Sequence, residues 1–387
     1  MAQRTTDVIV LGAGVIGASI AYHLARAGAS VRHFDRAEPA AAPSASWASA
    51  GGLRSQGRHA GERALTRAAV LRWGTLAEEL EADLEVRLAG HLHIAESEAE
   101  CRVLAERIEA DRDLGIESLD RAALRDLAPR LTERAMAGAY TRDDGQAHPG
   151  RTARSFTAAA ARLGAIGGFS VDCRLATAGE VIVGVDCADG NHYAASLVVV
   201  ACGAWSTGLL EAVGIDLPLR WRALQMLLSD VAPPLLGPTV TAVGRNLSLK
   251  QGPTGQLMVG GRWYCEPLAG RMAARSNEAR IARQWSTAVG ILPAMARQRL
   301  AHAWIGIEAQ SIDGQPFVGR IAARPGLYVA TGFSNHGFQI SPAIGSEVAA
   351  DLVGGTPAVA LAAFDPARAQ SVGAAERAAF RAEPIAG

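Results

Sequence analysis

The feature that most constrains the fold of this chain is a glycine-patterned turn between a short apolar run and a helix-forming stretch. Residues 7–11 (DVIVL) form a short, mainly apolar run, and Gly12, Gly14 and Gly17 follow at the spacing GxGxxG. Asp35 ends a second strand-like run, 23 residues after Gly12. Glycines at this spacing allow a tight turn and a close approach to a pyrophosphate, and an acid in this place binds a ribose hydroxyl. The pattern predicts a βαβ unit that binds a dinucleotide, whose identity it leaves open.

Composition narrows the class of partner. The chain has 387 residues, of which 49% are hydrophobic and 20% charged, so it can bury a large core in more than one compact unit. Its 38 basic residues are balanced by 38 acidic ones, so we expect a small-molecule partner and neither nucleic acid nor membrane. No apolar stretch reaches the roughly 18 to 20 residues of a membrane span without a charge.

The cysteines point to neither a disulfide framework nor a zinc site, and we expect no metal. They are odd in number, scattered, and never in a CxxC pair: Cys101, Cys173, Cys187, Cys202 and Cys265. We therefore expect a soluble protein of the reducing cytoplasm. The apolar residues 8–21 carry the patterned glycines, and we interpret them as part of the fold rather than as a signal peptide.

The order of the expected elements indicates a discontinuous organisation. Apolar strands at 197–201 and 326–332 resemble the N-terminal unit, whereas the β-like segments at 220–229, 246–250 and 256–263 belong to a second body. Helical periodicity predicts helices over 61–83, 97–114, 120–127, 150–163, 276–290 and 341–353. Short strands are also expected around 91–95, 169–172 and 181–185.

Four further segments carry a family resemblance. They are residues 46–54 (SWASAGGLR), 201–206 (ACGAWS), 304–319 (WIGIEAQSIDGQPFVG) and 331–345 (TGFSNHGFQISPAIG). In order and spacing they resemble the glycine oxidase, sarcosine oxidase and D-amino-acid oxidase superfamily of FAD-dependent amine oxidoreductases, closest in style to glycine oxidase. The likeness runs nearly from end to end.

The resemblance implies an α/β fold with two domains and FAD between them. A Rossmann-like FAD-binding domain, with a βαβ unit of the glutathione-reductase type, would comprise residues 1–85, 145–215 and 318–387. A substrate domain with a mainly antiparallel sheet would comprise residues 86–144 and 216–317.

The resemblance also implies which residues bind FAD. Small residues at 46–52 would let the backbone pass beside the pyrophosphate and the flavin ring, and 169–171 would be a strand beside the adenine. Residues 332–339 would bring backbone N–H groups to the flavin N1/C2 edge. The expected set is Gly12, Gly14, Val15, Ile16, Gly17, Asp35, Arg36, Ser46, Trp47, Ala50, Gly51, Gly52, Val171, Cys202, Gly203, Trp205, Gly306, Gly332, Asn335, His336, Gly337, Phe338 and Gln339.

Three positions depart from relatives in the family. Some relatives attach the flavin through a cysteine seven positions before the residue matching Asp313, where this chain has Gly306, so non-covalent FAD is expected. Glycine-oxidase-like enzymes carry a carboxylate-binding arginine where this chain has Glu308, and monomeric sarcosine oxidases carry a lysine where it has Gln339. The usual anchors for a substrate carboxylate are therefore missing.

Other residues are expected to serve the substrate. Arg54 is our candidate for the carboxylate anchor, with Arg245, Arg262 and Lys250, the single lysine of the chain, in reserve. We expect Glu308 to face the substrate and His336 to position it. Trp263 and Tyr264 either cover the substrate or belong to the core.

We therefore expect oxidation of the C–N bond of an amino acid or an N-substituted glycine by hydride transfer to flavin N5, with O2 as acceptor. The imine product would be hydrolysed by water. Two alternatives stay open: a subunit of a heteromeric amine, proline or sarcosine-type dehydrogenase, and a non-catalytic flavin-binding redox sensor. A homo-oligomer and a heteromeric partner both remain compatible with the sequence.

Overall fold

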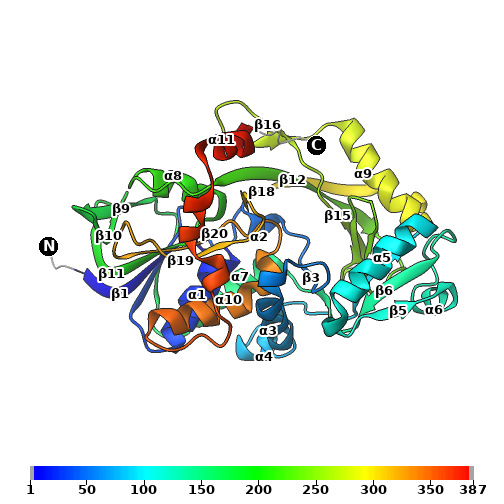
Figure 1. Ribbon diagram of the computed structural model, residues 1–387, viewed down its shortest axis with the longest axis horizontal. Coiled ribbons are helices and arrows are strands. Elements are labelled where there is room, and N and C mark those ends of the chain that lie inside the picture. The colour runs from blue at the N-terminus through cyan, green and yellow to red at the C-terminus, as the bar shows by residue number, and fades with distance from the viewer. Residues whose placement is uncertain (1–3, 383–387) are drawn as a thin grey trace.

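The computed structural model describes residues 4–382, and its strands form two large sheets at opposite ends of the long axis of the molecule (Figure 1). The first sheet has the order β19-β20-β11-β1-β2-β8, with the β9–β10 hairpin added to β11. Its strands are β1 (Arg4–Leu11), β2 (Val31–Phe34), β8 (Ile166–Gly168), β9 (Cys173–Ala178), β10 (Val181–Cys187), β11 (His192–Val200), β19 (Phe317–Arg320) and β20 (Leu327–Thr331).

The apolar run of the dinucleotide motif forms the central strand of this sheet. β1 pairs in parallel with both β11 and β2, and its residues Ile9 and Val10 are fully buried because both faces of the sheet are covered. One face packs on α1, α3, α7 and α10 in a single hydrophobic core. These helices are α1 (Val15–Arg26), α3 (Arg63–Trp73), α7 (Pro149–Arg162) and α10 (Gly337–Leu352).

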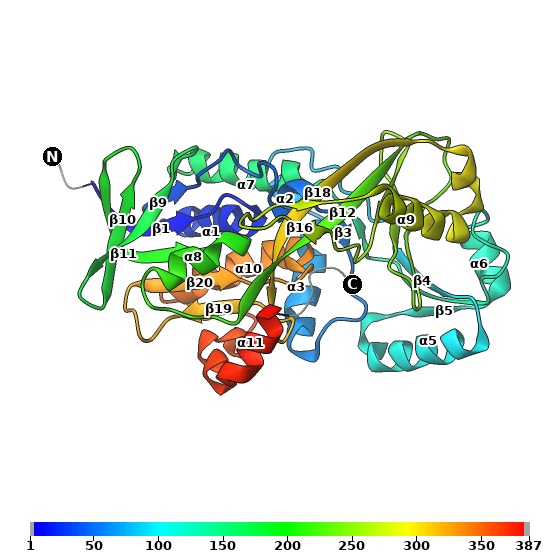
Figure 2. The same cartoon turned by 90° about the horizontal axis from the view of Figure 1, so that it is seen from above.

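The second sheet has the order β18-β12-β15-β14-β13-β4-β6-β5 and is antiparallel except for the β13–β4 pair. Figures 1 and 2 show its long strands β12 and β18 reaching back toward the first sheet. Its strands are β4 (His91–Ala95), β5 (Glu117–Leu119), β6 (Ala137–Thr141), β12 (Leu219–Val231), β13 (Thr239–Ala242), β14 (Ser248–Gln251), β15 (Gln256–Gly260) and β18 (Leu300–Ser311).

Helices and short elements complete the chain. The helices of the second part are α5 (Glu98–Ala110), α6 (Arg121–Leu127) and α9 (Glu278–Ile291). The short elements are α2 (Ala45–Ala48), α4 (Leu76–Glu79), α8 (Ser206–Glu211), α11 (Ala374–Ala382), the two-residue pair β3 (Gly52–Leu53) and β7 (Gly145–Gln146), and the pair β16 (Glu266–Pro267) and β17 (Ala274–Arg275). No helix within residues 4–382 is long and apolar enough to cross a membrane.

The predicted fold class is confirmed: a mainly parallel sheet covered by helices is joined to a mainly antiparallel sheet. Strands of the first sheet come from residues 4–34, 166–200 and 317–331, and strands of the second from residues 91–141 and 219–311. This interleaving places the chain crossings near the expected domain boundaries, which themselves stay a prediction.

Three local expectations were wrong. The helix expected over 61–83 is split into α3 and α4, because the chain leaves the helix at Gly74. The strand expected at 169–172 is the connection between β8 and β9, where Ser170 has a left-handed backbone with φ of 60°. Helix α10 begins at Gly337, four residues before the expected start.

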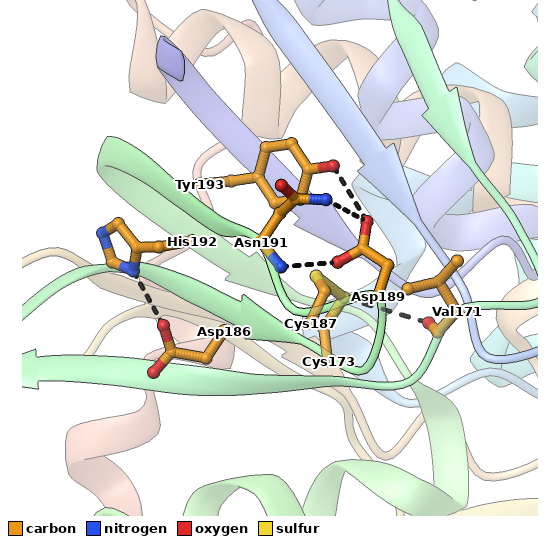
Figure 3. The surroundings of a disulfide bond; sticks show 8 residues. All are labelled: Val171, Cys173, Asp186, Cys187, Asp189, Asn191, His192 and Tyr193. Atoms are coloured by element: carbon orange, nitrogen blue, oxygen red, sulfur yellow. Dashed lines mark hydrogen bonds and ion pairs between the residues drawn. A yellow bond between two sulfur atoms is a disulfide. The ribbon is translucent and has the colours of Figure 1, made fainter. Parts of the chain in front are cut away.

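The prediction that the cysteines form no disulfide was also wrong. Cys173 and Cys187 are bonded to each other across the β9–β10 hairpin, where they are register partners (Figure 3). Beside them Asp189 accepts hydrogen bonds from Asn191 and from the Tyr193 hydroxyl, which order the turn. The expectation of a reducing compartment therefore loses the support that it drew from the cysteines.

Candidate active site

A cavity of about 910 Å³ lies between the two sheets. Its wall combines the glycine turn after β1, the segment around α2, and the loop between β20 and α10 with residues of the second sheet. This volume is at the upper end of the roughly 300 to 1,000 Å³ typical of ligand sites. The cavity can therefore hold a large cofactor together with a small substrate.

The glycine turn fits a pyrophosphate. A Cβ on Gly12, whose φ is 106°, would lie 2.4 Å from the Ala201 carbonyl oxygen, and a Cβ on Gly17 would lie 1.8 Å from the Gly12 carbonyl oxygen. The protein itself therefore excludes side chains at these two positions. Gly14 differs, because it has an extended backbone and its nearest obstacle is Ser46 Oγ at 3.2 Å. Gly14 faces the cavity, so the space beside it remains available for a ligand.

The start of α1 and the end of β2 provide the groups that a dinucleotide needs. The Val15 N–H at the positive end of α1 donates to Ser46 Oγ over 2.9 Å. Asp35 lines the cavity and is held by the N–H groups of Ala13 at 2.6 Å and Ala37 at 2.9 Å. A carboxylate has about four acceptor positions, so Asp35 can also accept from a ribose.

The residues around Gly306 leave no place for a covalent flavin link. Gly306 lies on β18, and a Cβ there would be 2.1 Å from the Cβ of Ala48. Cys202 lines the cavity near Asp35, and burial raises the pKa of its thiol. A protonated thiol is a poor nucleophile. FAD in this cavity is therefore expected to be non-covalent.

The loop before α10 directs the start of that helix into the cavity. Gly332, Ser334 and Asn335 have φ of 78°, 48° and 72°, and the last two are strained for residues with a side chain. The Ser311 N–H donates to Ser334 Oγ over 3.1 Å and holds the loop. The N–H groups of the first turn of α10 lack acceptors within the helix and carry partial positive charge, which suits an acceptor of negative charge.

Arginines gather at one end of the cavity, where they lie near His336, the residue before α10. Arg54 follows β3, Arg58 lies four residues later, Arg107 comes from α5, and Arg262 follows β15. Burial and the three neighbouring guanidiniums lower the pKa of Arg54 to about 9, so it stays cationic at neutral pH. This end of the cavity favours anions.

Two titratable groups beside the arginines are neutral at pH 7. Burial and the Arg58 charge lower the pKa of His336 to about 4, although its Nδ1 lies 3.2 Å from Glu62 Oε2. Burial raises the pKa of Glu308 to about 8, against the opposing effect of Arg262 and Arg222. A neutral imidazole that is fixed by a carboxylate suits a positioning role.

The structure brings most of the expected residues into one wall. The expected residues that line the cavity are Gly12, Gly14, Val15, Ile16, Asp35, Arg36, Ser46, Ala50, Gly52, Arg54, Val171, Cys202, Gly203, Trp205, Arg245, Arg262, Gly306, Glu308, Gly332, Asn335, His336, Gly337, Phe338 and Gln339. This shared location is consistent with a single site for cofactor and substrate.

Other expected residues lie outside the wall or are already paired. Gly17, Trp47, Gly51, Trp263, Tyr264 and Lys250 are not among the described residues that line the cavity. Lys250 is buried on β14, and burial lowers its pKa to about 7. Arg245 forms ion pairs with Glu96 at 2.6 Å and Glu100 at 2.7 Å, so its charge is already balanced.

Sequence reasoning missed several polar residues of this site. Arg58, Arg107, His91 and His93 line the cavity, and Asp144 lies behind Arg54 and accepts the Ser55 N–H at 2.9 and 3.0 Å. The two histidines alternate in one strand, which places both side chains on one face, and that pattern was the available signal.

Comparison with known proteins agrees with this geometry. Residues 7–351 match the model of the family described as FAD dependent oxidoreductase. The glycine oxidase of Geobacillus kaustophilus is 30% identical over 90% of this chain and 92% of its own length. The crystal structure of glycine oxidase from the same organism superposes with a TM-score of 0.85 at 26% identity, and the match covers 94% of this chain and 98% of that one. The sarcosine oxidase subunit beta of an Arthrobacter species is 24% identical over 90% of this chain and 87% of its own. The L-proline dehydrogenase of P. horikoshii has a TM-score of 0.88 at 21% identity, covering 95% of this chain and 99% of that one.

Proposed function

Because this chain belongs to the family of FAD-dependent oxidoreductases, we propose that it oxidises the C–N bond of an amino acid or an N-substituted glycine. The chain is an FAD-dependent amine oxidoreductase, and what we propose is the class of its substrate and its electron acceptor. The observation that carries the proposal is the pairing of a pyrophosphate cradle with a cluster of arginines in one cavity.

Different residues of the cavity would bind FAD and the substrate. Gly14, Asp35 and the start of α1 would bind the pyrophosphate and ribose of FAD, and the start of α10 would lie against the flavin. When bound, FAD accepts a hydride equivalent from the carbon next to the substrate nitrogen. The chain then has to hold the amino acid so that this carbon faces the flavin.

Arg54 is the proposed anchor for the substrate carboxylate. It stays cationic at neutral pH, it lines the cavity, and within residues 4–382 its side chain forms no hydrogen bond or ion pair. A guanidinium can bind a carboxylate through two parallel hydrogen bonds, which sets the orientation as well as the affinity. Neutral His336 would contribute to positioning without competing for the anion.

O2 is the proposed electron acceptor, because a glycine oxidase is among the relatives of this chain. The similarity to a sarcosine oxidase subunit beta supports a second candidate, in which this chain is one subunit of an enzyme that passes electrons to another carrier. The two candidates share the substrate chemistry and differ in the reoxidation of the flavin.

Anaerobic mixing of the yellow holoenzyme with N-alkyl glycines and with D- and L-amino acids tests both candidates. We expect the flavin absorbance to bleach with a subset of these amines, and to return rapidly on admission of air. Slow return in air with fast return on an artificial acceptor would favour the subunit candidate. No bleaching with any amine would contradict the proposal and favour a non-catalytic flavin sensor.

Acid or heat denaturation is expected to release FAD intact. The reason is that Gly306 leaves no room for a side chain and that the thiol of Cys202 stays protonated. The measurement is flavin absorbance in the supernatant and the pellet after precipitation. Flavin that remains on the denatured polypeptide would show that a covalent link exists.

Glu308 is expected to make anion binding depend on pH. Its pKa is about 8, so its carboxyl is neutral at lower pH and adds a negative charge beside Arg262 and Arg222 at higher pH. Binding of the inert acid methoxyacetate should therefore weaken as pH rises through this pKa. Titration by flavin absorbance from about one pH unit below this pKa up to the pKa itself, where Arg54 keeps its charge, should show the weakening in wild type and not in Glu308→Gln. The same weakening in the variant would assign it to another group.

A further inference from the structure

We propose that the substrate is a secondary amine with a carboxylate on each of its two arms, and that Arg54 and Arg262 bind one carboxylate each. This inference rests on the proposed function, since it names the substrate class for the same site. N-carboxyalkyl amino acids form this class, and iminodiacetate is the simplest of them.

The first observation is an excess of positive charge. Arg54, Arg58, Arg107 and Arg262 line one end of the cavity, and the other three act electrostatically on Arg54. Among the described carboxylates of the wall, Glu308 is the one beside these arginines, and burial raises its pKa to about 8. One carboxylate from a simple amino acid would balance only part of this charge.

The second observation is which guanidiniums lack partners. Arg58 donates through Nε and Nη2 to the Arg54 carbonyl oxygen at 3.0 and 2.8 Å, and Arg107 Nη1 donates to His93 Nε2 at 2.9 Å. In contrast, the side chains of Arg54 and Arg262 form no hydrogen bond or ion pair within residues 4–382. Arg54 is half-buried and Arg262 is exposed, and both line the cavity, so both guanidiniums are open to anionic groups of a ligand.

The acids behind the arginines offset only part of their positive charge. Burial raises the pKa of Asp144 to about 6, and both of its oxygens accept the Ser55 N–H. Asp111 pairs with Arg63 at 3.0 Å, and Glu62 lies 3.2 Å from the His336 ring nitrogen. Glu62 and Asp144 act electrostatically on Arg58, and Asp111 acts on Arg107, so these acids offset part of the positive charge, chiefly at Arg58 and Arg107.

A chain of hydrogen bonds through His93, Thr241 and His91 fixes which ring nitrogens of the two histidines carry protons. Because the Arg107 guanidinium can only donate, His93 accepts at Nε2 and carries its proton on Nδ1, which donates to Thr241 Oγ1 at 2.6 Å. The Thr241 hydroxyl then donates to His91 Nε2 at 2.9 Å, so the proton of His91 is on Nδ1.

This donor has no acceptor. His91 lines the cavity with only 1% of its surface exposed, and its Nδ1 is buried without a partner. An N–H group in a wall that is already cationic suits an anion and not an ammonium group. This unpaired N–H group lies near Arg54, Arg58 and Arg107 and adds no acceptor to the wall, which agrees with anion binding.

The chemistry balances for such a substrate. The carbon next to nitrogen loses a hydride equivalent to the flavin, the nitrogen lone pair forms the C=N bond, and the nitrogen loses its proton. Water then adds to this carbon and the C–N bond breaks. The products are a 2-oxo acid, whose carbonyl oxygen comes from water, and a primary amine that retains the other carboxylate as an amino acid.

Inert ethers test the inference in the holoenzyme without turnover. Diglycolate and its longer homologue 3-(carboxymethoxy)propanoate carry two carboxylates, and methoxyacetate carries one. Titration by flavin absorbance should show that the tighter of the two diacids binds at least about tenfold more tightly than methoxyacetate, the gain expected from one added charged hydrogen bond. The variant Arg262→Gln should lose this preference and keep its affinity for methoxyacetate.

A charge-matched variant is the control. Arg271→Gln removes the same charge from an exposed residue that is not among the described lining residues, and should keep the preference. Equal affinity of wild type for one and two carboxylates, or a preference that survives Arg262→Gln, would overturn the inference.

Anaerobic bleaching separates the inference from the proposed function. We expect iminodiacetate to reduce the flavin at lower concentration than sarcosine, which lacks one carboxylate. Bleaching by amines without this preference would overturn the two-carboxylate site and leave the proposed function in place. Preferential binding of the diacid without bleaching by any amine would support the two-anion site and contradict the proposed function.

Discussion

Replacing Gly14 by valine is expected to give a folded protein that has lost nearly all of its FAD. Gly14 has an extended backbone that any residue can adopt, and the nearest obstacle to a Cβ is the rotatable Ser46 side chain at 3.2 Å. The added side chain would instead occupy the space where the pyrophosphate approaches the backbone. The measurement is flavin absorbance per mole of purified protein, with the unfolding temperature recorded in parallel.

A second glycine variant separates ligand from fold. In Gly17→Ala the new Cβ would lie 1.8 Å from the Gly12 carbonyl oxygen, so we expect loss of the folded protein itself. A fully yellow Gly14→Val protein would contradict the assignment of the cofactor site. A stable Gly17→Ala protein would show that the turn can rearrange.

Replacing Arg54 by alanine is expected to lower kcat/KM by about thirty-fold or more while the FAD content stays normal. The loss of an anchoring pair between opposite charges costs about 2 to 5 kcal/mol. The Arg54 side chain forms no hydrogen bond or ion pair within residues 4–382, so its removal breaks no internal pair that would confuse the result. Steady-state kinetics with the best amine of the anaerobic panel provides the measurement.

Two variants control this prediction. Arg54→Lys should recover part of the lost kcat/KM, because it restores the charge without the two-pronged geometry. Arg67→Ala removes an exposed arginine of α3 that is paired with Asp113, and should stay within about twofold of wild type. Unchanged kcat/KM in Arg54→Ala would show that the substrate binds elsewhere in the cavity.

The cofactor half of the site was predictable because its signals are local. The strand, the three glycines and Asp35 lie within residues 7–35, and helix and strand geometry alone brings them together. The family resemblance placed the segments at 46–54 and 331–345 beside them, and both line the cavity. The strand that the resemblance predicted at residues 169–171 was wrong. Val171 nevertheless lies beside Asp35 and donates its N–H to the Asp35 carbonyl oxygen at 3.0 Å.

The substrate half was only partly predictable, because its residues meet through the second sheet. Arg107 comes from α5, and an arginine on a charged helix is most often exposed to solvent, so no local signal marks it. The register of β4 with β13 brings His91 and His93 to Thr241, and this parallel pairing cannot be read from either strand alone. The Cys173–Cys187 bond was missed for the same reason, since it depends on the register of β9 with β10.

The most direct test of the central claim is an anaerobic titration of the holoenzyme with iminodiacetate that counts reduced flavin and carbonyl product together. If FAD and a carboxylate-anchored amine share this cavity, the flavin bleaches and an equimolar amount of 2-oxo acid forms. A flavin that stays oxidised in the presence of every amine tested, or a carbonyl product that forms without flavin reduction, would contradict the assignment of amine oxidation to this site.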